Sequence, residues 1–185
     1  MTRLLPTVIV LASGRGARFT ASGGAVHKLS ATLGGKALIE HTLAAVRASS
    51  LPWHVEDAGH PGMGDSIAAA VRATHDAAGW LILPADLPLV QSHTLMNVAQ
   101  TLIAPARAVQ PAYLGKRGHP VAFAPECRAA LLALQGNQGA SPVLQALRQA
   151  GQVVDLEVDD IGIVTDIDTL DDLARAQALW LSRER

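Results

Sequence analysis

The sequence has little of what disulfide-rich or nucleic-acid-binding proteins depend on. It contains one cysteine, Cys127, in 185 residues, so no internal disulfide can form, which argues against a small secreted domain stapled by disulfides. Because Cys127 lies in a helix-like run, we expect it to be a small core residue. Aromatic residues make up only 3% of the chain, too few for a platform on which single-stranded nucleic acid could stack.

The chain also lacks an excess of charge of either sign. Lys and Arg number 15 and Asp and Glu number 16, which gives a formal net charge of −1. Any phosphate must therefore be bound by local geometry, not by bulk attraction. No apolar stretch approaches the roughly 20 residues that span a bilayer, and Pro6 interrupts the apolar run near the N-terminus, unlike a signal peptide. We expect a soluble cytoplasmic protein that binds neither nucleic acid nor membrane.

Several common catalytic motifs are missing. The 7 histidines form neither an HExxH motif nor a Cys/His cluster, which disfavours a zinc site. Ser13 and Ser66 do not lie in a Gly-x-Ser-x-Gly elbow, which disfavours a serine hydrolase. Phe19 stands where a third glycine would complete GxGxxG, and no Gly-Lys-Ser/Thr follows. The dinucleotide fingerprint and the P-loop are therefore both excluded.

What the sequence does contain is an alternation of short aliphatic runs with longer amphipathic runs rich in Ala and Leu. This alternation is typical of βα units and predicts one α/β domain over residues 1–185 with a mostly parallel sheet. Thr7–Ala12 and Trp80–Ala85 are predicted to be buried central strands. The other expected elements are a strand at 53–57, helices at 36–49, 65–78, 125–135, 141–150 and 169–182, a hairpin at 108–123, and strands at 153–158 and 163–167.

Residues that could bind a ligand or a metal ion follow three of these predicted strands. In an open α/β sheet, ligands bind beyond the carboxyl ends of the strands. Gly14 and Gly16 follow the first strand and can present backbone N–H groups to an anion, while Arg18 can pair with phosphate oxygens. An ordinary glycine turn beside an exposed arginine is the alternative interpretation of this loop.

Asp86 and Asp168 are candidate ligands for Mg²⁺, which prefers carboxylate oxygens. We expect the two carboxylates to lie within roughly 5–8 Å of each other, with Asp166, two residues earlier on the same predicted strand, as a reserve ligand. A turn or helix-capping role for Asp86 is the alternative. Asp171 and Asp172 are expected to serve the start of the last helix instead.

Two further segments could contact a ligand. Gly62–Ser66 opens a predicted helix, where free N–H groups favour anions, although simple capping by Asp65 and Ser66 would also explain the segment. Gly118 and His119 open a strand and could touch a substrate; the alternative is that His119 is a structural loop histidine.

In their order along the chain, these motifs resemble the MobA-like nucleotidyltransferases, and within that family most closely the molybdenum-cofactor cytidylyltransferases. The segments are LASGRGARF, HKL, LGGKALIEHTL, GMGDSIAAAV, LPADLPLV, GHPVAF, NQGASPVL and DIDTLDDL, which extend over nearly the whole chain. The resemblance implies a three-layer α/β/α Rossmann-like fold. It also implies that a nucleoside monophosphate passes from an NTP to a phosphorylated acceptor, with release of pyrophosphate.

The resemblance further implies roles for particular residues. CTP is the favoured nucleotide, because Ser13 stands where the cytidylyl branch tends to have Ala and the guanylyl branch Gly, and its side chain would crowd a purine. The implied acceptor is molybdopterin, with a molybdoenzyme as a partner. The implied sets are Leu11, Ala12, Ser13, Gly14, Gly16, Arg18, Lys28, Gly64 and Ser66 for the nucleotide; Gly118 and His119 for the acceptor; Arg18, Lys28 and Asp86 for catalysis; and Asp86 and Asp168 for Mg²⁺.

The sequence departs from the family pattern in several places. The stretch Phe19–Lys28 is longer than the usual link from Arg to Lys. The segment 50–62 is too short for the family's strand, helix and strand, so one βα unit is expected to be missing. Asn137 and Ser141 stand where the family tends to have Asp and Arg. Two other functions therefore stay open: a sugar- or polyol-phosphate nucleotidyltransferase, and a non-catalytic nucleotide-binding maturation protein.

Overall fold

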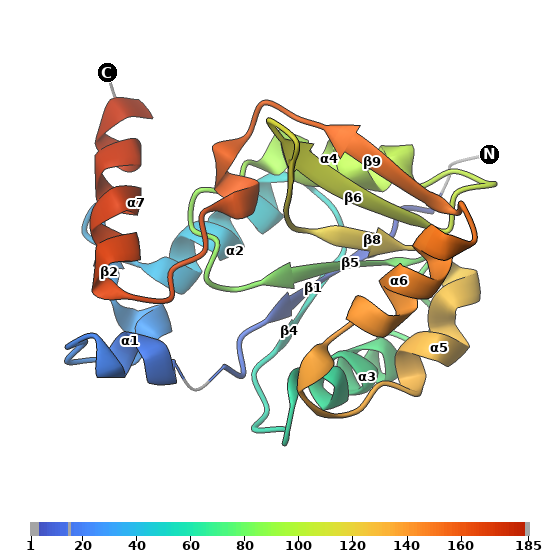
Figure 1. Ribbon diagram of the computed structural model, residues 1–185, viewed down its shortest axis with the longest axis horizontal. Coiled ribbons are helices and arrows are strands. Elements are labelled where there is room, and N and C mark those ends of the chain that lie inside the picture. Colours follow the sequence, from blue (N-terminus) through green and yellow to red (C-terminus); the bar gives the residue numbers. More distant parts are fainter. Residues whose placement is uncertain (1–3, 15, 184–185) are drawn as a thin grey trace.

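A computed structural model describes residues 4–14 and 16–183 of the chain (Figure 1). Within this part, 7 strands form one mixed sheet in the order β4-β1-β5-β8-β6-β7, with β9 also paired to β6. β1 is parallel to β4 and β5, and β9 is parallel to β6, whereas β8 runs antiparallel to β5 and β6. The strands are β1 (Thr7–Leu11), β4 (Trp53–Glu56), β5 (Trp80–Pro84), β6 (Ala108–Tyr113), β7 (Lys116–Arg117), β8 (Val121–Phe123) and β9 (Val153–Glu157); β2 (Thr32–Leu33) and β3 (Lys36–Ala37) form a separate hairpin.

Helices cover both faces of the sheet. In Figure 1, α3, α5 and α6 lie on one side of it, α2 and α4 lie on the other, and α7 stands apart beside α1 and β2. None of the helices among the described residues has the length and apolar character needed to cross a membrane. The helices are α1 (Ala17–Ala21), α2 (Leu38–Ala48), α3 (Met63–Ala73), α4 (Ser92–Thr101), α5 (Arg128–Leu132), α6 (Ser141–Gln149) and α7 (Leu170–Arg183), with 3₁₀ turns at Lys28–Ser30, Pro125–Cys127, Gly136–Gln138 and Ile161–Val164.

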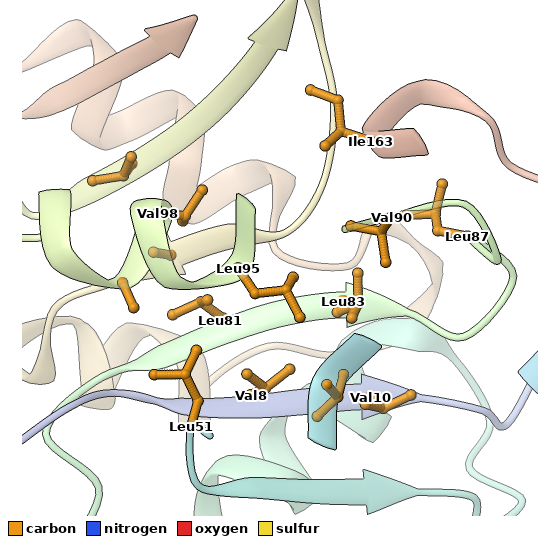
Figure 2. Close-up of a cluster of buried hydrophobic side chains, with 14 of the residues drawn as sticks. Val8, Val10, Leu51, Leu81, Leu83, Leu87, Val90, Leu95, Val98 and Ile163 are labelled. Atoms are coloured by element: carbon orange, nitrogen blue, oxygen red, sulfur yellow. The ribbon is translucent and has the colours of Figure 1, made fainter. Parts of the chain in front are cut away.

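The central strand β1 is buried on both faces, as its continuous apolar run predicts. Because side chains alternate along a strand, Val8 and Val10 pack into the cluster on the α2 and α4 side of the sheet (Figure 2). Ile9 packs on the opposite face with Ile67 of α3. All of these side chains are fully buried. The three-layer α/β/α arrangement predicted from the sequence is therefore confirmed.

A third apolar cluster joins the N-terminal segment to the last helix. Phe19 of α1 and Leu33 of β2 are buried with Ile167 and with Ala176 of α7. In Figure 1, the two ends of the colour range meet in this region, where α1 and β2 lie beside α7. The cluster holds the stretch between α1 and β2, which includes Lys28, against the residues that precede α7.

The strand predicted at 163–167 is wrong. Ile161–Val164 forms a 3₁₀ turn instead, and β9 is the strand that lies parallel to β6. The turn packs closely on the loop after β5, because a Cβ placed on Gly162 would lie 2.1 Å from the carbonyl oxygen of Leu89. The segment is therefore fixed by this close backbone contact and not by a strand partner. Asp166 consequently does not share a strand face with Asp168.

The segment between α2 and α3 contains the single strand β4, which confirms the strand predicted at 53–57. β4 is one end of the described sheet, as the shortness of this segment predicts. The start of α3 differs from the prediction, however. The helix begins at Met63 and its N-cap is Gly62, so Asp65 and Ser66 lie inside the first turn instead of capping it.

Candidate active site

A cleft of about 760 Å³ opens beyond the carboxyl ends of β1 and β5, a volume within the usual range of small-molecule sites. Its walls come from the loop after β1, the start of α3, the residues after β5, the β7–β8 connection and the segment before α7. Of the residues predicted for the site, those that line the cleft are Leu11, Ser13, Gly14, Gly16, Arg18, Lys28, Ser66, Asp86, Gly118, His119, Asp168 and the reserve ligand Asp166.

Ala12 and Gly64 are not among the lining residues. Gly64 has a packing role instead, because a Cβ at this position would lie 2.8 Å from the backbone of Gln135. Gly62 is subject to the same constraint, with a Cβ only 2.4 Å from the backbone of Gly136. Asp65 accepts a hydrogen bond of 2.9 Å from the Gly136 N–H. These contacts fix the start of α3 against the 3₁₀ turn that carries Asn137, another lining residue.

Lys28 is the centre of the charged network in the cleft. Its ammonium nitrogen donates to Asp86 Oδ2 at 2.6 Å and to Asp168 Oδ1 at 3.1 Å. Arg18 adds an ion pair of 2.8 Å to the other oxygen of Asp168. Burial by itself favours the neutral amine, but the attraction and hydrogen bonds of the two carboxylates outweigh it and raise the pKa of Lys28. Lys28 is therefore a cation at neutral pH.

Asp86 and Asp168 are brought together by backbone as well as by charge. The Ile167 N–H donates to the carbonyl oxygen of Asp86 at 3.1 Å, so the segment before α7 lies directly beside the end of β5. Because one ammonium touches both carboxylates, their nearest oxygens lie within roughly 6 Å of each other. Asp86 and Asp168 are thus neighbours in space although they are far apart in the sequence.

The carboxylates of Asp86 and Asp168 suit a metal ion that takes only one or two protein ligands and fills its other coordination sites with other ligands. Asp86 Oδ1 is buried and has no hydrogen-bond partner among the described residues, which leaves a carboxylate oxygen free for a ligand. No group of three His, Cys, Asp or Glu side chains within residues 4–14 and 16–183 could hold a metal by itself. Mg²⁺ commonly uses one or two carboxylates and completes its shell with phosphate and water. Asp86 and Asp168 fit that requirement.

The loop after β1 is shaped for close approach by a ligand. Gly14 is open, with no atom within 4 Å of a Cβ placed there. Gly16 has a φ of 61° and is the N-cap of α1, a left-handed conformation that favours glycine. A Cβ at Gly16 would lie 3.0 Å from Lys28 Cβ. Gly16 therefore allows the loop to lie directly against Lys28.

A hydroxyl pair joins this loop to α3. Ser13 Oγ and Ser66 Oγ lie 2.9 Å apart, and the Ser66 hydroxyl donates to the Gly62 carbonyl oxygen at 3.2 Å. Both serines line the cleft. The pair therefore fixes the side chain of Ser13 in the cleft wall, a contact between distant residues that no local sequence pattern could reveal.

The β7–β8 connection forms another wall. A Cβ at Gly118 would lie 2.2 Å from the Ile163 carbonyl oxygen, and the His119 N–H donates to that oxygen at 3.0 Å. Burial lowers the pKa of His119, and its Nδ1 has no partner among the described residues. Lys116 and Arg117 also line the cleft, although the sequence interpretation did not include them. Their position directly before Gly118-His119-Pro120 is the sequence feature that could have indicated that they line the cleft.

The segment after Asp168 serves the last helix, as predicted for Asp172. Asp172 Oδ2 accepts from the Thr169 N–H at 2.8 Å, and the Asp172 N–H donates to Thr169 Oγ1 at 3.2 Å, a reciprocal capping box. Although burial opposes its charge, the hydrogen bonds from Thr169 and Arg175 lower the pKa of Asp172. Asp168 is thereby left to face the cleft.

A three-layer α/β fold with a glycine loop, basic side chains and paired carboxylates at one cleft is typical of enzymes that bind nucleotides. The chain belongs to the MobA-like NTP transferase domain family, with the match extending over residues 43–153. A search of curated proteins gives no significant match.

Solved structures with the same fold are similar over nearly the whole chain. Rv0371c from Mycobacterium tuberculosis H37Rv has 22% identity and a TM-score of 0.76, covering 96% of this chain and 100% of that one, and it has also been solved in complex with manganese. A nucleotidyl transferase from Methanothermobacter thermautotrophicus has 20% identity and a TM-score of 0.77, covering 97% and 99%. Molybdopterin-guanine dinucleotide biosynthesis protein A from Archaeoglobus fulgidus has 21% identity and a TM-score of 0.59, covering 95% and 99%.

Proposed function

We propose that the protein transfers CMP from CTP to molybdopterin, with release of pyrophosphate. The observation that carries this proposal is the contact of one ammonium, that of Lys28, with both Asp86 and Asp168 beside an open glycine loop. Cationic groups for a triphosphate and carboxylates for a divalent cation then lie in one cleft. Membership of the MobA-like NTP transferase family supports an NTP as the substrate.

The roles of the side chains follow from their positions. The loop N–H groups around Gly14 would bind phosphate oxygens, and Arg18 and Lys28 would neutralise the charge that develops on the leaving pyrophosphate. Asp86 and Asp168 would hold Mg²⁺, which when bound would neutralise charge on the transferred phosphate. The manganese complex of the similar mycobacterial protein supports the use of a divalent cation. An acceptor phosphate is already ionised at neutral pH, so the reaction needs positioning and not a general base.

The choice of CTP rests on Ser13. Its hydroxyl is held in the cleft wall by Ser66 at 2.9 Å, so it cannot easily turn away from a bound base. A fixed side chain at this point leaves less room than glycine would, which favours a pyrimidine over a purine. We expect Ser13→Gly to improve the use of GTP relative to CTP by about tenfold, which corresponds to about 1.4 kcal/mol. An unchanged ratio of kcat/KM for the two nucleotides would contradict this role of Ser13.

The choice of molybdopterin rests on the motif resemblance and on the β7–β8 connection. Lys116 lies at that wall of the cleft with Gly118 and His119, so an anionic acceptor would meet a cation there. The archaeal protein named for molybdopterin-guanine dinucleotide biosynthesis has a similar structure. Its name also makes GTP the nucleotide against which CTP must be compared.

The deciding experiment measures pyrophosphate release. The purified protein would be incubated with Mg²⁺, each of the four NTPs, and molybdopterin, a sugar phosphate or a polyol phosphate as the acceptor. We expect the fastest release with CTP and molybdopterin, and none from Asp86→Asn or Asp168→Asn, which should keep the wild-type circular dichroism spectrum. If pyrophosphate is released only with a sugar phosphate or a polyol phosphate, that compound and not molybdopterin is the acceptor. If the protein binds nucleotide but releases no pyrophosphate with any acceptor, the proposed enzyme activity is refuted and a non-catalytic maturation protein is supported.

A further inference from the structure

His27 connects two parts of the site without lining the cleft itself. Its Nε2 lies 3.0 Å from the carbonyl oxygen of Gly14, in the loop after β1. Its Nδ1 accepts from the Leu29 N–H at 3.4 Å, which makes His27 the N-cap of the 3₁₀ turn that begins with Lys28. One imidazole thus contacts both the loop and the turn that carries the central cation.

These contacts determine which ring nitrogen carries the proton. A backbone N–H can only donate, so Nδ1 must be the acceptor toward Leu29. The Gly14 carbonyl oxygen can only accept, so Nε2 must carry the hydrogen. Both bonds form together only in the neutral tautomer with hydrogen on Nε2. The ring is therefore satisfied on both sides by backbone groups, and its position and orientation are defined.

The loop and the turn need such a connection because the chain between them is long. Gly14 and His27 are 13 positions apart, and most residues from 20 to 27 are exposed. Gly16 also approaches the turn closely, against Lys28 Cβ. The ammonium of Lys28 is held by Asp86 and Asp168, and His27 adds a direct link from the backbone of the turn to the loop.

We infer that His27 is a positioning residue for the triphosphate: it holds the Gly14 carbonyl and the turn of Lys28 in one arrangement, so that the loop N–H groups and the ammonium meet the same ligand. The inference rests on the proposed function only in assigning a triphosphate to the loop. His27 does not touch the ligand, and its effect is on the affinity for phosphate and not on the acceptor.

The two contacts can be separated by substitution. His27→Asn keeps an acceptor near the place of Nδ1 and so keeps the cap on Leu29, but it loses the bond to Gly14. His27→Gln can place an amide N–H near the position of Nε2 and so keeps the bond to Gly14. His27→Ala loses both. His75→Ala is the matched control, because His75 is exposed and does not line the cleft.

The probes are inorganic triphosphate without metal, measured by calorimetry, and CTP in the pyrophosphate assay. We expect His27→Ala and His27→Asn to weaken triphosphate binding and to raise the KM for CTP by about three- to tenfold, the range of one net hydrogen bond. His27→Gln should stay within about twofold of the wild type, and kcat and the KM for the acceptor should change little.

A merely structural role gives a different result. In that case triphosphate affinity would rise and fall with the melting temperature across the variants. His27→Asn, which keeps the cap, would then retain an affinity close to that of the wild type, whereas His27→Gln would not. That outcome, or unchanged triphosphate affinity in His27→Ala, would overturn the inference. Because triphosphate binding needs no acceptor and no turnover, failure of the proposed reaction would leave this measurement intact and separately interpretable.

Discussion

Replacing Lys28 by methionine should strengthen the binding of a divalent cation in the absence of nucleotide. The ammonium of Lys28 is 2.6 Å from Asp86 Oδ2 and 3.1 Å from Asp168 Oδ1, so it occupies the space between the carboxylates. A cation that enters must displace it. Two unit charges about 3 Å apart interact by roughly 5 kcal/mol at an effective dielectric constant of about 20. Only about 1.4 kcal/mol of that is needed for a tenfold change in affinity.

The assay is Mn²⁺ binding at pH 7, followed by the loss of the free-ion electron paramagnetic resonance signal. We expect Lys28→Met to bind Mn²⁺ at least about tenfold more tightly than the wild type, while Lys28→Arg, which keeps the charge, stays close to it. Arg18→Met is the second control: the Arg18 side chain is 78% exposed, against 11% for Lys28, so water already screens its charge. Equal gains for Arg18→Met and Lys28→Met, or no gain for Lys28→Met, would refute the reasoning.

Two further predictions concern packing and pH. Gly62→Ala should lower the melting temperature and reduce the free energy of unfolding by about 1–3 kcal/mol, because its Cβ would lie 2.4 Å from the backbone of Gly136. Gly14→Ala is the control. It has open space around its Cβ, so it should keep the melting temperature and change only the affinity for nucleotide. Hydrogen bonds from Arg117 and Arg148 lower the pKa of Asp155 to about 2 from 3.8. The stability that Asp155 contributes is therefore present above about pH 4 and lost as the pH falls toward 2, and thermal melts across that range should show Asp155→Asn converging on the wild type.

The main strands of the sheet and the helices α2, α3, α5, α6 and α7 could be predicted from the sequence because their patterns are local, whereas α1, α4 and the β2–β3 hairpin were not predicted. The apolar run of β1 gives a strand buried on both faces, and the alternation of apolar and polar residues places the long helices. The segment 163–167 has the composition of a strand but not its environment. Its backbone packs on the loop after β5 through Gly162, a contact that depends on the whole fold.

The site could be predicted only where the type of a residue and its position along the chain indicate a chemical role. Asp86 and Asp168 were predicted from their residue type and position and Lys28 from the family resemblance, and the structure places all of them in one cleft. The nucleotide-binding role of Gly64 was implied by the family resemblance and stays a prediction, and the close approach of Gly64 to the backbone of Gln135 has no sequence signal. The contacts of His27 could not be predicted because its partners are backbone groups, which have no sequence signal.

The ion pair between Lys28 and Asp168 joins residues 140 positions apart, which has a consequence for the order of synthesis. At roughly 5–20 residues per second on the ribosome, Lys28 is made roughly 7–28 seconds before Asp168. During that interval the nascent chain carries Arg18 and Lys28 without the carboxylate of Asp168. A chain released before the segment that precedes α7 would lack Ile167 and Ala176, and would expose the faces of Phe19 and Leu33 that pack against them.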